Sequence, residues 1–167
     1  MARMRTFGII LIAAILLLAG SGCSKSCGGD CLHGGSCSDG VCSCVNNWFG
    51  DHCDTLCTLG YEGRYCATLS RTKFIGTWNC QSNGQSFQIY FTPDTLQPVY
   101  MNLRNFNGKG YSVYCTLTGF SQFDINQQIS TGLIHAAVSG SAQMDGGKLI
   151  LYLNEDNVQY FGTATKQ

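Results

Sequence analysis

The sequence predicts an all-β protein, with a small disulfide-rich module followed by an antiparallel eight-stranded up-and-down β-barrel. Residues 23–66 hold nine of the eleven cysteines and almost no aliphatic residues, so covalent staples have to replace a hydrophobic core there. Residues 70–167 hold only Cys80 and Cys115, and their apolar residues alternate with polar ones in short runs. A period of two is typical of half-buried strands, and the Asn-Gly and Asp-Gly turns between the runs are typical of β-hairpins.

The first 22 residues are typical of a secretory signal peptide. Residues 1–5 contain two arginines and no acidic residue, and an apolar run of 14 residues, 7–20, follows before a few small residues. The alternative, a membrane-spanning helix, needs roughly 20 apolar residues, and this run is shorter. Export implies an oxidising compartment, where disulfides persist.

Cys23 ends this leader, within the sequence Gly20-Ser21-Gly22-Cys23. These residues resemble a bacterial lipobox, in which a lipoprotein signal peptidase cuts before a cysteine that carries a diacylglycerol. The resemblance implies lipidation of Cys23 by acyl chains such as palmitate, a tether of residues 23–26, and the membrane as a partner through the lipid. The odd number of cysteines agrees with this interpretation, because acylation of one of the eleven leaves an even number, ten, for disulfides. The alternative is ordinary cleavage with Cys23 free or bonded to another molecule.

The charge that remains after the leader argues against some partners. Without Arg3 and Arg5, the chain has eight basic and ten acidic residues, a formal charge of −2. The sequence has no cluster of lysines and arginines, so neither nucleic acid nor an anionic membrane surface is expected as a partner.

The next six cysteines have a distinctive spacing, Cys27-x3-Cys31-x5-Cys37-x4-Cys42-x-Cys44-x8-Cys53. Six cysteines alone allow 15 pairings. The run resembles an EGF-like domain of residues 27–53, which implies the disulfides Cys27–Cys37, Cys31–Cys42 and Cys44–Cys53. The positions that hold calcium in one subclass of these domains lack suitable ligands here. A zinc site is the rival for the cysteines, but we expect neither a metal nor another cofactor.

Residues 54–66 repeat the end of this domain. The segment 57–66 aligns with 44–53, since both have the spacing C-x8-C with an aromatic residue and a glycine at matching positions. We therefore predict a fourth disulfide, Cys57–Cys66, in a partial EGF-like hairpin. Each short loop contributes only a few kcal/mol, and together the bridges replace the missing core.

The segment 67–167 is predicted to form the barrel. Alternation and turn signals place eight strands near residues 74–81, 86–92, 98–106, 110–118, 122–129, 133–142, 147–154 and 157–165. The connections are too short for crossover helices, which indicates an antiparallel meander, and closure removes exposed strand edges. An open β-sandwich is the alternative.

Two predictions concern the inside of this barrel. Cys80 and Cys115 share strand faces with apolar residues, so we expect them to form a fifth disulfide; two free buried thiols are the alternative. The motif Gly76-Thr77-Trp78 resembles the first strand of lipocalin-like and avidin-like barrels. An eight-stranded barrel can be filled by its own side chains or hold one small molecule, and large residues favour filling. The lining of such an apolar ligand would be Phe74, Trp78, Phe87, Ile89, Phe91, Met101 and Leu151.

The sequence shows no catalytic set, so we predict that the protein is not an enzyme. His33 and His52 fall in the EGF-like segment, His135 falls in a predicted strand, and the acidic pair Glu155-Asp156 is assigned to a turn as solvated charge. No nucleophile elbow, phosphate-binding glycine loop or H-E-x-x-H motif occurs in the sequence.

The whole layout, with a domain that begins KFIGTWNC at Lys73, resembles a group of bacterial lipoproteins, especially from Bacteroidetes. The resemblance implies a membrane-anchored lipoprotein of the bacterial cell envelope, with the outer membrane as the expected address. One hypothesis is a non-enzymatic interaction or binding module, whose EGF-like stalk presents the barrel and the outward-facing Tyr100, Tyr114 and Tyr152 to an unknown protein or glycan partner. The alternative is a lipocalin-like carrier of a small apolar ligand.

Overall fold

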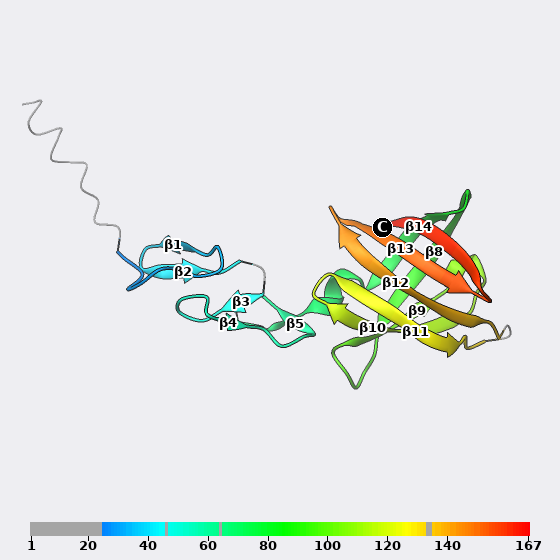
Figure 1. Ribbon diagram of the computed structural model, residues 1–167, viewed down its shortest axis with the longest axis horizontal. Helices are drawn as coiled ribbons and strands as arrows, with labels where there is room; N and C mark the ends of the chain where they lie inside the picture. The colour runs from blue at the N-terminus through cyan, green and yellow to red at the C-terminus, as the bar shows by residue number, and fades with distance from the viewer. Residues whose placement is uncertain (1–24, 46, 64, 133–134) are drawn as a thin grey trace, which may run out of the picture.

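A computed structural model describes residues 25–45, 47–63, 65–132 and 135–167. Within these ranges the regular structure is three two-stranded sheets, a closed antiparallel barrel of eight strands, and two short 3-10 helices. Figure 1 shows the small sheets following one another as an elongated module beside the barrel. The predicted fold class is therefore confirmed, and the sandwich alternative is wrong. The predicted signal peptide and the lipidation site Cys23 lie outside the described residues.

The N-terminal module, residues 27–69, is built from three hairpins and is called the stalk below. Its paired strands are β1 (Ser36–Ser38) with β2 (Val41–Ser43), β3 (Trp48–Phe49) with β4 (Thr55–Leu56), and β5 (Tyr61–Glu62) with β6 (Thr68–Leu69). Because β6 pairs with β5, the last hairpin continues past Cys66, the predicted end of the repeat.

All four disulfides expected in the stalk are present. They are Cys27–Cys37, Cys31–Cys42, Cys44–Cys53 and Cys57–Cys66. The pairing implied by the EGF-like resemblance and the bridge inferred from the repeat are both confirmed. The most buried hydrophobic residues of the stalk are cysteines, Cys42, Cys53 and Cys57, so the sulfur bridges take the place of an aliphatic core.

The sequence repeat recurs in the backbone hydrogen bonds. The amide of Cys57 donates to the carbonyl of Asn47 over 2.8 Å, and the amide of Ser70 donates to the carbonyl of Gly60 over 2.9 Å. Both residues of the second bond are the repeat equivalents of those in the first. The first bond joins one hairpin to the next, and the second joins the last hairpin to the start of the barrel domain.

The barrel is an uninterrupted meander. Its strands are β7 (Gly76–Ser82), β8 (Gln85–Pro93), β9 (Tyr100–Arg104), β10 (Ser112–Gly119), β11 (Gln122–Ile129), β12 (Ala137–Asp145), β13 (Lys148–Glu155) and β14 (Val158–Lys166). Each strand pairs with the next, and β14 closes the barrel against β7 with Ala164 opposite Cys80. His135 precedes β12 and is exposed, so its predicted position within a strand is wrong.

The meander gives the barrel two distinct ends. At the proximal end, next to the stalk, lie the helix η1 (Ser70–Lys73) and the connection 94–99. Arg71 fastens the two together, because its Nη1 lies 2.8 Å, 2.7 Å and 3.0 Å from the carbonyl oxygens of Asp94, Gln97 and Tyr100. At the distal end lie the hairpin 83–84, the loop with η2 (Phe106–Gly108) and the hairpin 156–157.

The predicted disulfide between Cys80 and Cys115 is wrong, since both are free buried cysteines. Cys80 lies on β7 and Cys115 on β10, with β8 and β9 between them. Three steps of about 4.8 Å along the sheet place the two backbones on the order of 14 Å apart, whereas a disulfide needs Cα atoms roughly 4.4–6.8 Å apart. Cys115 instead lies opposite Met101 on the neighbouring strand.

We expect these two thiols to be unreactive in the native protein. Burial raises the pKa of Cys80 to about 11 and raises the pKa of Cys115 as well, and the thiolate is the form that reacts. Thiol titration of the Cys23→Ser variant should detect no thiol under native conditions and the thiols of both Cys80 and Cys115 in guanidinium. Failure to detect them in denaturant would show that a fifth bridge forms after all.

Candidate functional site

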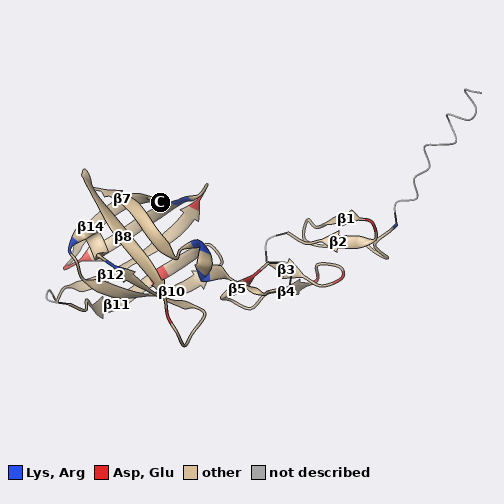
Figure 2. Ribbon diagram, turned by 180° about the vertical axis from the view of Figure 1, so that it is seen from behind, with Lys and Arg blue, Asp and Glu red and all other residues tan. Residues whose placement is uncertain are grey.

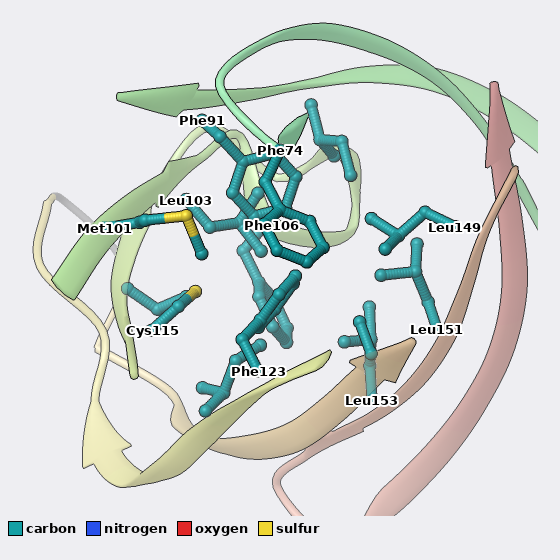
Figure 3. Close-up of a cluster of buried hydrophobic side chains, with 14 of the residues drawn as sticks. Phe74, Phe91, Met101, Leu103, Phe106, Cys115, Phe123, Leu149, Leu151 and Leu153 are labelled. Carbon is teal, nitrogen blue, oxygen red and sulfur yellow. The ribbon is translucent and has the colours of Figure 1, made fainter. Parts of the chain in front are cut away.

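The barrel interior is filled by its own side chains. The predicted lining residues Phe74, Trp78, Ile89, Phe91, Met101 and Leu151 are at most 2% exposed, and Phe87 packs against them from the rim. Figure 3 shows side chains from opposite walls meeting in the middle, where Phe123 contacts Phe74 and Phe91 edge-on with ring centroids 5.3 Å apart. These residues form a packed core, and the hypothesis of an internal ligand gains no support from their arrangement.

A buried carboxylate closes the distal end. Glu155 is 4% exposed and accepts hydrogen bonds from the Nζ of Lys109 over 2.8 Å, the Nδ2 of Asn107 over 3.2 Å, and the hydroxyl of Tyr111. Tyr111 is itself buried and stacks on Phe106. Three donors from the η2 loop therefore converge on one acid at the end of β13.

Burial by itself raises the pKa of Glu155, but the hydrogen bonds from Lys109, Tyr111 and Asn107 outweigh it and hold the pKa below its ordinary value. Burial, together with the hydrogen bond to Glu155, raises the pKa of Tyr111. The same carboxylate raises the pKa of Lys109. Around neutral pH the cluster therefore contains one carboxylate, one ammonium and one neutral phenol, a satisfied ion pair that fixes the loop to the barrel.

The sequence interpretation of Glu155 as solvated turn charge is wrong. The signal that would have placed it correctly is the alternation of Leu149, Leu151 and Leu153, because the next residue on that inward face is Glu155. Each inward position of β13 is buried in the same way. Asp156, in contrast, lies in the turn and is exposed.

The junction with the stalk is held by an ion pair and by backbone contacts. The Nζ of Lys73 lies 2.6 Å from the Oε2 of Glu62 and 2.7 Å from the carbonyl oxygen of Phe120. Lys73 thus joins the last hairpin of the stalk to the turn between β10 and β11. Gly60 also lies against the barrel, because a Cβ there would approach Val99 to 3.0 Å. These contacts place the last hairpin of the stalk against the proximal end of the barrel.

One group of cysteines approaches the geometry of a metal site. The sulfur atoms of Cys27, Cys31 and Cys37 lie within 4.8 Å of one another. All three are oxidised in disulfides, and a metal requires thiolates. This group is therefore a part of the disulfide framework.

Two large aromatic residues lie side by side on the outer wall. Tyr152 of β13 and Phe161 of β14 are register partners, with ring centroids 5.2 Å apart, and they are 56% and 53% exposed. Tyr100 and Tyr114 are exposed too, so the predicted outward orientation of all three tyrosines is confirmed. Phe161 was not singled out from the sequence.

Three shallow hollows continue from this aromatic pair along the wall formed by β13, β14, β7 and β8. The first, of about 500 Å³, is lined by Tyr152 and Phe161 and shares Asn83 with the second. The second shares Gln81 and Thr163 with the third. We call the three together the outer-wall groove. Apart from Lys148 and the phenols of Tyr152 and Tyr160, its polar side chains are amides and hydroxyls, namely Asn79, Gln81, Ser82, Asn83, Gln85, Ser86, Gln88, Ser141, Asn154, Gln159, Thr163 and Thr165.

The outer-wall groove is almost without charge. Lys148, at the end of the third hollow, is the one ionisable lysine, arginine or acid that lines any of the three within the described residues. Figure 2 shows the corresponding strands β7, β8 and β14 in tan over most of their length. Amides, hydroxyls and exposed rings in a neutral hollow can hydrogen-bond and stack, but they offer no acid, base or nucleophile pair.

None of the helical segments in the described ranges is both long and apolar enough to cross a membrane.

Comparison with known proteins identifies no family. No family model and no curated protein matches the chain. Among solved structures, the chain is similar to a redesigned β-barrel, with 18% sequence identity and a TM-score of 0.44 over 59% of this chain and 95% of that one. The strand pairing of the chain itself defines the closed barrel.

Proposed function

We propose that the chain is a lipid-anchored protein of the bacterial cell envelope that acts as a non-enzymatic binding module. In this proposal an EGF-like stalk, anchored through Cys23, holds the barrel away from the membrane, and the outer wall of the barrel binds the partner. The observation that carries the proposal is the arrangement of stalk and barrel: the stalk docks on the proximal end, the interior is filled, and the aromatic pair on the wall stays exposed.

The disulfides support the proposed location in the cell envelope. Four bridges within residues 27–66 are typical of an exported protein, because reducing compartments keep thiols free. The lipobox-like sequence at Cys23 and the signal-like leader point the same way. Several acyl chains on one N-terminus anchor a protein stably, whereas a single chain anchors it only marginally.

The experiment is intact-mass spectrometry of the protein purified from membranes, with and without reduction. We expect a chain that begins at Cys23, carries acyl chains, and gains the mass of eight hydrogen atoms when a thiol reductant reduces its four disulfides. Cys23→Ser is the matched control and should yield an unacylated protein. A soluble, unacylated native chain, or one that retains its leader, would overturn the proposal.

A further inference from the structure

We infer that the outer-wall groove is a binding site for a neutral glycan. The inference rests on the proposed function and names the ligand class of that module. Two exposed aromatic rings stand at one end of a shallow hollow whose other polar side chains are amides and hydroxyls, with Lys148 at the far end. A sugar ring has apolar C–H faces and a rim of hydroxyls. A sugar therefore matches both parts of the lining. Its C–H faces can pack on the aromatic rings, and its hydroxyls can form hydrogen bonds with the amides.

The amides suit a polyhydroxylated ligand in particular. An Asn or Gln side chain offers two donors and an acceptor, and a hydroxyl group is itself both donor and acceptor. Gln81, Asn83 and Gln159 make no side-chain hydrogen bond within the described part of the chain. All three residues are exposed and line the hollows, so a ligand can bond to their side chains without first breaking hydrogen bonds of the protein.

Charge complementarity selects against other ligand classes. A phosphate-rich or carboxylate-rich polymer requires arginines or lysines, and the groove contributes Lys148 alone. A protein partner usually requires about 800 Å² of surface with a substantially apolar centre, whereas here two rings adjoin a long polar strip. The uncharged lining therefore favours an uncharged partner.

The aromatic pair is pre-organised for ligand binding. Ser141, Tyr152 and Phe161 form one row across β12, β13 and β14, because each is the register partner of the next. Side chains on paired strands of a closed barrel lose little further freedom on binding, which lowers the entropic cost of association.

The test measures binding of neutral and charged polysaccharides to the full-length protein purified from membranes in detergent. Biolayer interferometry would use β-glucan, xylan, mannan and galactan as neutral probes, and heparin and polygalacturonate as charged ones. We expect binding of at least one neutral polysaccharide and weaker binding of the charged ones. Tyr152→Ala and Phe161→Ala should each weaken binding by about tenfold, the scale of one aromatic contact.

The matched control is Ile129→Ala, which removes a comparably exposed apolar side chain (60%) from β11, outside the groove. It should leave the affinity unchanged, and thermal melts should show that all three variants fold. The inference is overturned if no neutral polysaccharide binds, if the control weakens binding equally, or if the groove variants instead abolish self-association of the chain in sedimentation. None of these results alters the mass-spectrometric test of the anchor, so the two proposals fail separately.

Discussion

Trp78→Ala is expected to lower the free energy of unfolding by about 3–5 kcal/mol, the range for deleting a large buried aromatic side chain. Trp78 is 0% exposed in the proximal part of the barrel core. Its Nε1 donates to the carbonyl oxygen of Phe74 over 2.6 Å. The substitution removes this hydrogen bond and leaves a cavity that rigid barrel walls cannot fully close, and both effects destabilise the fold.

Urea unfolding of the wild type and the variant would measure this loss as a shift of the midpoint at unchanged slope. The matched control is Tyr114→Ala, whose side chain is 56% exposed and whose loss should change the free energy of unfolding by no more than about 0.5 kcal/mol. A cost below about 1 kcal/mol for Trp78→Ala would mean that the wild-type interior is already hollow. That result would support the hypothesis of a lipocalin-like carrier.

Most strand positions followed well from the sequence, although the strand predicted near 133–142 is β12, Ala137–Asp145, and one small error at the end of a strand misplaced an acidic residue. Alternation predicted a strand near 147–154, and β13 spans Lys148–Glu155. Because side chains alternate between faces, this extension places Glu155 inside the barrel rather than in the turn. An acidic residue on an inward face was assigned to solvent, since its partners lie far away in sequence on the η2 loop.

Cys80 and Cys115 show which structural information hydrophobic alternation does not contain. Alternation correctly directed Cys80 and Cys115 inward, but it says nothing about where two strands stand around the circumference of a barrel. That position follows from the number of strands between them, and two intervening strands are too many for a disulfide. The stalk pairings were predictable because a family resemblance and a direct repeat supplied the missing geometry.

The outer-wall groove could not have been assembled from the sequence. Alternation directs Tyr152 outward, yet its contact with Phe161 depends on the register of β13 and β14. That register is set by the two-residue turn Asp156-Asn157, in which both residues have positive φ, +49° and +70°. Such turns fit the twist of paired strands. The turn was recognised from its residues, but the shared neutral lining with β7 requires closure of the barrel.

Glu155→Gln is expected to lower the free energy of unfolding by about 2 kcal/mol at neutral pH, the scale of a hydrogen bond to a charged group. The amide keeps the shape of the side chain but loses the charge that Lys109 faces, and its NH₂ group cannot accept from the donors around it. Tyr111→Phe should destabilise the same cluster through loss of the phenol donor.

The pH dependence distinguishes this ion pair from simple packing. Because the pKa of Glu155 lies below its ordinary value in the folded protein, its stabilising effect is complete above that ordinary value, near 4.5, and is lost as the pH falls through the folded pKa. Because the pKa of Lys109 is raised in the folded protein, its stabilising effect is complete below the ordinary lysine value near 10.5 and is lost as the pH rises through the folded pKa. The difference in unfolding free energy between wild type and Glu155→Gln should therefore stay level between these limits and shrink in acid. Asp145→Asn, at the exposed end of β12, serves as the control and should change the free energy of unfolding at neutral pH by no more than about 0.5 kcal/mol. If the difference for Glu155→Gln persists undiminished in strong acid, the loss of stability comes from packing. The charge of Glu155 then does not contribute to closing the distal end.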